Sequence, residues 1–236
     1  MRLKNQILYS ILFILFCKYS YALEVTLTQG TVKPTPIAIT DLYSSNNSNL
    51  KIGKNISAVI SDNLERSGLF LPINKQAFIQ SSESLSKQPR FEDWKVIKAQ
   101  HLVSGKINKV NNNISVEFRL FDVFQQKQII GKKYQTTESN WRRVAHIISD
   151  KIYERLTGEK GYFDTRIIYV SEEGPKTKRV KKLAIMDQDG FNTKYLTLGN
   201  ELVLTPRFNP TNQMVTYLSY FRNLPRVYLL DIETGI

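Results

Sequence analysis

Two long segments of the chain carry apolar residues at three- and four-residue spacing, which places them on one face of a helix. In residues 52–67 the spaced residues are Ile52, Ile56, Val59, Ile60 and Leu64. In residues 140–156 they are Trp141, Ala145, Ile148, Ile152 and Leu156. A glycine follows each segment, Gly68 and Gly158, where a left-handed residue commonly ends a helix. The pattern predicts two long amphipathic helices.

Between these helices, apolar and polar residues alternate, which predicts strands with one buried face. The clearest case is a hairpin in which residues 101–110 and 114–123 are joined by an Asn111–Asn113 turn. Further expected elements are strands at 37–39, 69–73 and 129–137 and a short helix at 91–99. Helices and strands mixed in this order favour an α+β domain over residues 34–158, with a mixed sheet and two long helices. Pro34 and Pro36 are expected to separate it from an extended arm at 23–33.

After a linker at 159–166, the helical spacing disappears and a strand–turn pattern repeats over residues 167–236. The first copy ends at Asp187-Gln-Asp-Gly190 and the second at Asp231-Ile-Glu-Thr-Gly235, so Asp231 follows Asp187 by 44 residues. This spacing is typical of propeller blades with WD40-like repeats. Because a propeller closes with about four blades or more, we expect the sequence to hold under two blades of an all-β propeller and to be cut short within it. Pairing with another chain is the alternative.

The first 22 residues have the layout of a secretory signal peptide. Arg2 and Lys4 precede an apolar run over residues 7–16, and small residues precede the expected cleavage between Ala22 and Leu23. An uncleaved membrane anchor is the alternative, but the apolar run is shorter than the roughly 18 residues expected of a span. The sequence therefore predicts export.

Cys17 is the only cysteine of the chain and lies within the predicted signal peptide. The bulky Phe16 before it and the charged Lys18 after it disfavour a lipid-modified cysteine. Cleavage would leave a chain without cysteine, in which neither disulfides nor thiol chemistry can operate.

The chain is basic, with 33 lysine and arginine residues against 21 acidic ones and a formal net charge of +12. The densest basic run, residues 176–182, is expected to form a solvated hairpin loop. A nucleic-acid-binding module is disfavoured because the other basic residues are scattered, do not interleave with aromatic residues, and follow an export signal.

No pattern in the sequence predicts catalysis, a cofactor or a metal. The two histidines, His101 at a strand start and His146 within a helix, lack the spacing of metal ligands. No HExxH, GxSxG or glycine-rich phosphate loop occurs. Asp187 and Asp189 allow a calcium site, but turn formation is the expected role for Asp and Gly at this position.

Several blocks of sequence, spread over most of the chain, together resemble the TolB family of the Tol–Pal system. In the amino-terminal half they are ISAVISDNLERSGLF (56–70), LVSGKI (102–107) and VEFRLFDV (116–123). The longest is RVAHIISDKIYERLTGEKGYFDTRIIYVSE (143–172). In the repeat region they are LAIMDQDG (183–190), LTPRFNP (204–210) and YLSYFRNLPRVYLLDIETG (217–235).

The resemblance implies a non-catalytic periplasmic adaptor with an α/β amino-terminal domain and a six-bladed propeller. It implies that the propeller binds the lipoprotein Pal and that the amino-terminal arm binds TolA, with other outer-membrane or peptidoglycan-associated proteins as further partners. Such a protein supports outer-membrane invagination at cell division and envelope integrity. The arm residues expected to contact TolA are Leu23, Glu24, Val25, Thr26, Leu27, Thr28, Gln29, Gly30, Thr31 and Val32.

Thr205, Pro206 and Arg207 are the candidates for a partner-facing rim of the propeller, and a plain structural turn is the alternative for them. The alternative for the whole chain is a propeller fragment of an exported peptidase. That interpretation requires a hydrolase segment outside this sequence.

Overall fold

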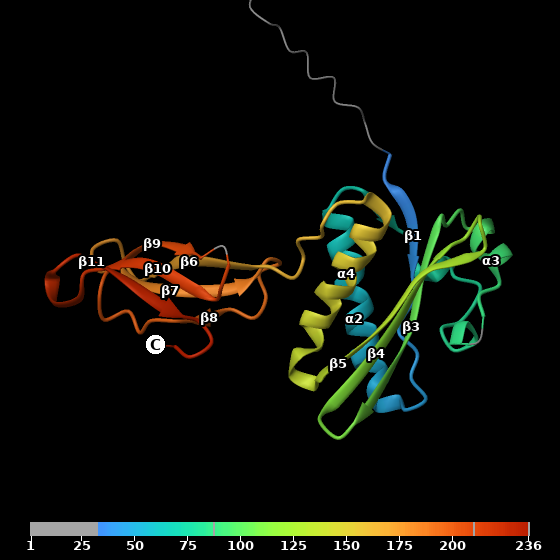
Figure 1. The fold of residues 1–236 in the computed structure, drawn as a ribbon, viewed down its shortest axis with the longest axis horizontal. Coiled ribbons are helices and arrows are strands. Elements are labelled where there is room, and N and C mark those ends of the chain that lie inside the picture. Colours follow the sequence, from blue (N-terminus) through green and yellow to red (C-terminus); the bar gives the residue numbers. More distant parts are fainter. Residues whose placement is uncertain (1–32, 87, 210, 236) are drawn as a thin grey trace, which may run out of the picture. The chain divides into compact units, whose positions relative to one another are not determined.

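The computed structural model describes residues 33–86, 88–209 and 211–235 (Figure 1). The predicted signal peptide, its cleavage site and the arm residues 23–32 lie outside the described residues. Within the described part, an α+β region is followed by two small antiparallel sheets. This order confirms the predicted fold class.

The α+β region is built on a five-stranded mixed sheet with the order β2-β1-β3-β4-β5. β1 runs parallel to both of its neighbours, and β3, β4 and β5 form an antiparallel meander. The strand bounds are β1 Thr35–Ile39, β2 Phe70–Pro72, β3 His101–Val110, β4 Asn113–Asp122 and β5 Lys127–Thr137. The predicted hairpin of β3 and β4 is confirmed, with Val110 paired to Asn113 at its turn.

β1 is buried on both faces, which explains its unbroken run of apolar residues. Ile37 and Ile39 belong to the larger core beneath the long helices, whereas Ala38 packs on the opposite face beside Trp94. The expected break at Pro34 and Pro36 is only partly correct, because Pro36 lies inside β1. The strand tolerates it because pairing with β3 starts one residue later, at Ile37, and Pro36 uses its carbonyl to accept a hydrogen bond from the amide of Gln100.

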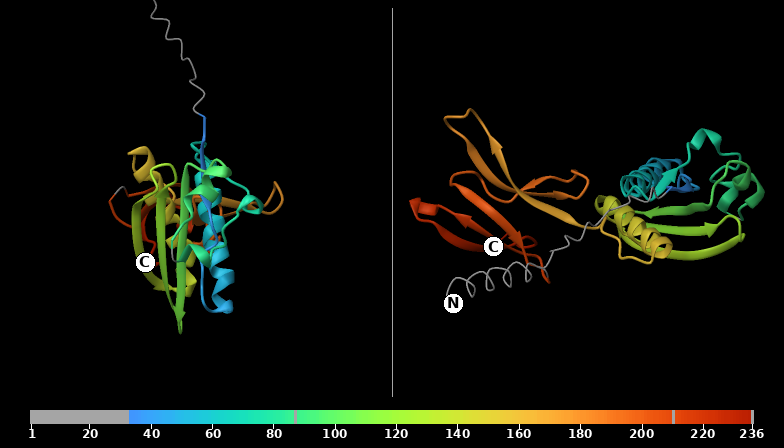
Figure 2. Two further views of the ribbon diagram at one scale, coloured as in Figure 1. Left: turned by 90° about the vertical axis from the view of Figure 1, so that its right-hand side faces the viewer. Right: turned by 90° about the horizontal axis from the view of Figure 1, so that it is seen from above.

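The two predicted long helices pack together over one face of this sheet (Figures 1 and 2). They are α2, Asn47–Arg66, and α4, Trp141–Thr157, and the short α3, Phe91–Val96, contributes Trp94 to the core on the other face. Three-residue 3-10 helices occur at Lys75–Ala77, Ser84–Ser86, Glu138–Asn140 and Phe221–Asn223. α2 begins about one turn earlier than predicted, in a polar segment without helical periodicity.

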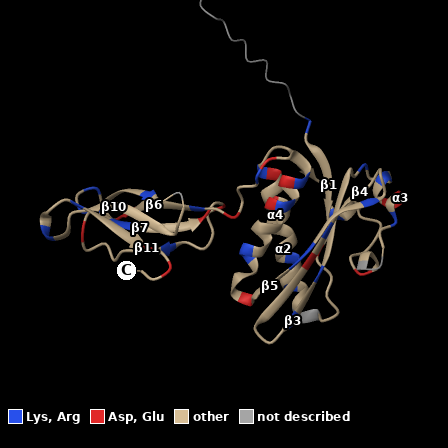
Figure 3. Ribbon diagram, viewed as in Figure 1, with Lys and Arg blue, Asp and Glu red and all other residues tan. Residues whose placement is uncertain are grey.

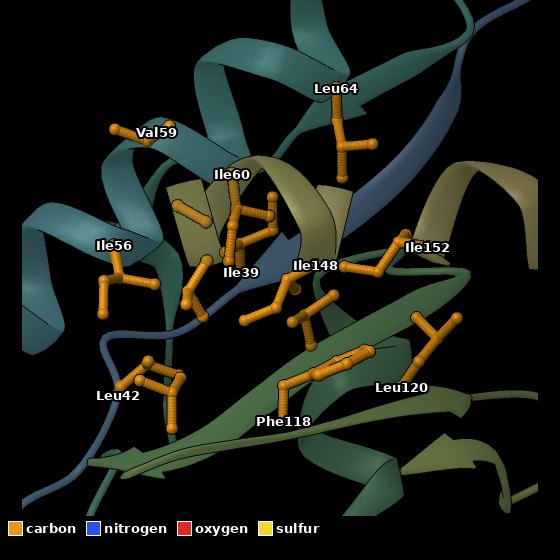
Figure 4. Packing of buried hydrophobic residues seen from close by; sticks show 14 of the residues in the cluster. Ile39, Leu42, Ile56, Val59, Ile60, Leu64, Phe118, Leu120, Ile148 and Ile152 are labelled. Carbon is orange, nitrogen blue, oxygen red and sulfur yellow. The ribbon is translucent and has the colours of Figure 1, made fainter. Parts of the chain in front are cut away.

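The core between the helices and the sheet contains the residues that the helical spacing identified (Figure 4). Ile56, Ile60, Leu64, Ile148 and Ile152 are fully buried. On the sheet side they meet fully buried strand residues, namely Val116, Phe118 and Leu120. The alternating apolar and polar residues of β4 therefore point alternately into the core and toward the surface.

Gly158 ends α4 in the left-handed conformation, with φ of +79°, and its amide donates to the carbonyl of Glu154. Alanine in this conformation is strained, so Gly158→Ala is expected to lower the free energy of unfolding by about 1 kcal/mol. Urea unfolding measures the change, with Lys160→Ala as a control in the exposed segment that follows. Equal stability of wild type and Gly158→Ala would contradict the left-handed helix end.

The repeat region forms two three-stranded antiparallel sheets, in the orders β6-β7-β8 and β11-β10-β9. The first consists of β6 Arg166–Glu173, β7 Val180–Asp187 and β8 Lys194–Tyr195. The second consists of β9 Val203–Phe208, β10 Met214–Ser219 and β11 Arg226–Asp231. A small core of Leu183, Val203, Val215 and Leu230 joins the two sheets.

The repeated closing turns predicted from the sequence are present in both sheets. Gly190 and Gly235 have φ of +87° and +75°, and their amides donate to the carbonyls of Asp187 and Asp231. Among the residues described, β11 leaves Val227 and Leu229 exposed, and an apolar face of this kind is where propeller blades pack on one another.

The expectation that residues 176–182 form a loop is only partly correct, because β7 already begins at Val180. Lys181 and Lys182 are strand residues that pair with Glu172 and Glu173 across the hairpin. Elsewhere along the ribbon, basic and acidic residues are interspersed (Figure 3). None of the helices described is both long and apolar enough to cross a membrane.

Candidate functional site

The candidate rim residues Thr205, Pro206 and Arg207 lie in β9. The pairing of β9 with β10 shifts here, so that Thr205 and Pro206 stand opposite the single residue Tyr217. This two-against-one arrangement is a β-bulge, and bulges often occur beside functional sites. Thr205 and Arg207 are exposed, and Pro206 is half-buried.

Thr205 has a positive φ of +47°, which is rare for a β-branched residue. Its backbone is therefore strained at the position where the strand bulges. The alternative for these residues was a plain structural turn. In the structure they instead form a bulge within strand β9.

A second group of polar residues contacts the turn after β7. We call Asn63, Arg142, His146, Asp187 and Asp189 the junction cluster. Asn63 comes from α2, Arg142 and His146 from α4, and the two aspartates from the closing turn of the β6–β8 sheet. Arg142 donates a hydrogen bond to Asp189, and its guanidinium lies 3.8 Å from the ring centre of Phe191. The side chains of Arg142 and Asp189 are only 14% and 6% exposed.

Asn63 is fully buried and makes four hydrogen bonds, so all its donors and acceptors are used. Its oxygen accepts from Arg66 at 2.6 Å and from Gln188 at 3.2 Å. Because arginine can only donate, this oxygen is assigned unambiguously, and the amide nitrogen must face His146 and Ser149. It lies 3.0 Å from both His146 Nδ1 and Ser149 Oγ.

This network fixes the protonation of His146. Since Nδ1 accepts a hydrogen from Asn63, the neutral ring carries its proton on Nε2. Nε2 is buried without a hydrogen-bond partner and lies 3.6 Å from Asp189 and 3.9 Å from Asp187. Burial lowers the pKa of His146, and the nearby Arg142 adds to this effect, against the opposing pull of the aspartates. Burial alone would raise the pKa of Asp189, but hydrogen bonds from Arg142 and the Phe191 amide outweigh it and hold that pKa low.

Among the described residues, one group could hold a metal ion. It consists of His146, Asp187 and Asp189, whose ligand atoms lie within 4.8 Å of one another. A metal would need the lone pair of Nε2, but the hydrogen bond from Asn63 places the proton on that atom. The guanidinium of Arg142 already neutralises Asp189. The residues therefore do not fit a bound cation, and the structure favours a polar contact network in this place.

The sequence alone did not indicate this network. The sequence predicts a turn at Asp187–Gly190 and places His146 within a helix, and both are present in the structure. The sequence does not predict that this turn contacts the long helices, because the contacting residues are far apart in the chain. Gln188 and Asn63, for example, are separated by 125 residues. The second histidine, His101, begins β3 as predicted and is not part of the cluster. The arm residues cannot be placed because they lie outside the described part of the chain.

Comparison with known proteins assigns both regions. The family model for the TolB amino-terminal domain matches residues 23–129, and the model for the TolB β-propeller domain matches residues 153–236. The chain is 63% identical to the Tol-Pal system protein TolB of Pelagibacter ubique (strain HTCC1062), over 96% of this chain and 53% of that protein.

The crystal structure of TolB from Acinetobacter baumannii is similar in fold, with a TM-score of 0.74 and 27% sequence identity. The match covers 86% of this chain and 48% of that one. The chain thus spans about half the length of the relatives that it matches. Over its amino-terminal domain and the first part of its propeller, the chain belongs to the TolB family of the Tol–Pal system.

Proposed function

We propose that the protein is a non-catalytic periplasmic adaptor that binds TolA through residues 23–32 and Pal through the propeller. In this role it supports outer-membrane invagination at cell division and the integrity of the envelope. The observation that carries the proposal is the occurrence of two TolB domain models in one chain, in the order expected of the family. The predicted signal peptide supports the periplasmic location.

The arm is the stronger of the two candidate contacts. Residues 23–32 precede β1, and the amino-terminal family model starts at residue 23, the first residue after the expected cleavage site. The arm can therefore be removed without deleting any strand or helix described here.

Calorimetric titration of the chain with the carboxy-terminal domain of TolA tests the arm. A chain that starts at Leu23 is expected to bind, and a chain that starts at Lys33 is expected to lose binding. The shorter chain keeps Thr35, whose amide pairs with the carbonyl of Leu69, so β1 and the sheet remain complete. Equal binding by both chains would place the contact elsewhere, and binding by neither would contradict the proposed role.

The rim is tested separately because Thr205 and Arg207 are exposed on β9. Arg207→Ala is expected to weaken Pal binding while TolA binding is unchanged, since the arm is intact. Lys194→Ala, an exposed lysine on β8, serves as a charge-matched control. Unchanged Pal affinity in Arg207→Ala would remove this residue from the contact surface.

A further inference from the structure

Helix α4 holds the β6–β8 sheet at two separate points. The first lies in the connecting segment of residues 162–165, here called the strap. The carboxylate of Asp150 accepts hydrogen bonds from the amides of Phe163 at 2.6 Å and Asp164 at 3.1 Å. The side chain of Phe163 is 1% exposed and belongs to the core beneath α4. The strap is therefore part of the folded α+β domain.

The second point is the junction cluster, about two turns nearer the start of α4. Arg142 precedes Asp150 by eight residues, which separates the two anchors by about 12 Å along the helix. Three consecutive residues of the β7–β8 turn take part in it. Asp189 accepts from Arg142, Gln188 donates to Asn63, and Asp187 lies 4.0 Å from Arg142.

The two anchors differ in their chemistry. The strap is held by an apolar side chain within a core, whereas the junction cluster is a buried ion pair with amide hydrogen bonds. Desolvation offsets most of the attraction within a buried ion pair, so such a pair contributes little net stability. Contacts between domains of one chain are commonly polar and permit relative motion.

We propose that the Arg142–Asp189 contact is a latch between the α+β domain and the first propeller sheet. When it is closed, α4 holds the sheet at both anchors. When it opens, the sheet stays attached through the strap and turns about it, while both regions remain folded.

Spin labels measure the latch directly. Cys17 is the only cysteine, so a Cys17→Ser background carries labels only where cysteine is introduced. Lys54→Cys labels the exposed side of α2, and Thr216→Cys labels an exposed position of β10, whose sheet shares a core with β7. In the exported full chain, pulsed electron paramagnetic resonance is expected to give one narrow distance distribution.

Arg142→Met keeps an apolar contact with Phe191 but removes the charge, and is expected to broaden the distribution and add a second distance. Asp189→Asn should do the same with a smaller change in side-chain shape. Lys151→Met is the control, because it removes an ion pair with Glu154 that lies entirely within α4. Its distribution should match that of the wild type.

Two results would overturn the proposal. One is an unchanged distribution in Asp189→Asn, which tests the charge even where Arg142→Met fails to fold. The other is equal broadening in Lys151→Met, which would assign the effect to a general loosening of α4. Tryptophan emission reports that the α+β domain stays folded in each variant, because Trp94 and Trp141 both lie in it.

Discussion

Gly105→Ala is expected to lower the free energy of unfolding of the α+β domain by about 3 kcal/mol or more. Gly105 lies in the middle of β3, where a Cβ atom would come within 2.1 Å of the Glu117 carbonyl oxygen and 2.7 Å of a Leu42 methyl group. The nearest obstacle is backbone of the paired strand β4, which cannot move without separating the hairpin. The substitution therefore displaces two central strands.

Gly131→Ala in β5 is the matched control. A Cβ at Gly131 would meet the end of the Gln128 side chain at 2.7 Å, and the nearest backbone atom lies 3.8 Å away. A flexible side chain can turn aside, so we expect a change within about 0.5 kcal/mol.

Urea unfolding followed by tryptophan emission measures both variants, because the only two tryptophans, Trp94 and Trp141, lie in the α+β domain. Gly105→Ala should shift the midpoint strongly and Gly131→Ala hardly at all. Equal midpoints for the two variants would contradict the close approach of β3 and β4 at Gly105.

The elements that could be predicted from the sequence are those specified by local patterns. The faces of α2 and α4 follow from the spacing of residues such as Ile56, Ile60 and Ile148, since burial of one helical face imposes that spacing. The β3–β4 hairpin follows from alternation and from the asparagine turn. The closing turns of the sheets follow from glycines that adopt positive φ, as Gly190 does.

What could not be predicted depends on pairs of residues far apart in the chain. Pro36 is accommodated in β1 only because β3 starts to pair one residue later. The strain at Thr205 arises from its register with β10. The junction cluster brings together Asn63 and His146, which are 83 residues apart, and their local sequences are those of ordinary helices. The spacing of the histidines in the sequence does not reveal that His146 faces two aspartates.

Asn63→Leu is expected to lower the free energy of unfolding by about 3 kcal/mol. Leucine has a similar volume but no polar atoms, so the buried His146 Nδ1 and the side-chain amide of Gln188 lose their partner. Ser149 Oγ loses the hydrogen that it accepts from Asn63 and keeps only its bond to the carbonyl of Ala145. Each buried polar group left without a partner costs about 1–3 kcal/mol. The same unfolding measurement tests it, and a loss below about 1 kcal/mol would contradict the network. Asp62→Leu, at an exposed position of the same helix, is the control.

Asn63→Asp is expected to reverse the pH dependence that His146 gives to stability. In the wild type, Nδ1 accepts a hydrogen and the pKa of His146 lies below its usual 6.5. The unfolded chain then binds a proton that the folded chain does not. The contribution of His146 to the free energy of unfolding is therefore fully present above pH 6.5. It decreases as the pH falls below this value, by at most about 1.4 kcal/mol per pH unit.

In Asn63→Asp, the new carboxylate accepts a hydrogen from a protonated Nδ1 and favours the imidazolium, which also faces Asp187 and Asp189. The nearby cations Arg66 and Arg142 oppose this, but Arg142 is neutralised by Asp189. The folded-state pKa of His146 is then expected above 6.5. The contribution of His146 to the free energy of unfolding is fully present at low pH and is lost as the pH rises through the raised pKa. Urea midpoints between about pH 5.5 and 8 should slope in opposite directions for the two proteins. His101, the other histidine, contributes equally to both and cancels in the comparison. Parallel slopes would mean that His146 does not take its proton state from Asn63, and the assignment of Nε2 as the protonated atom would fail with it.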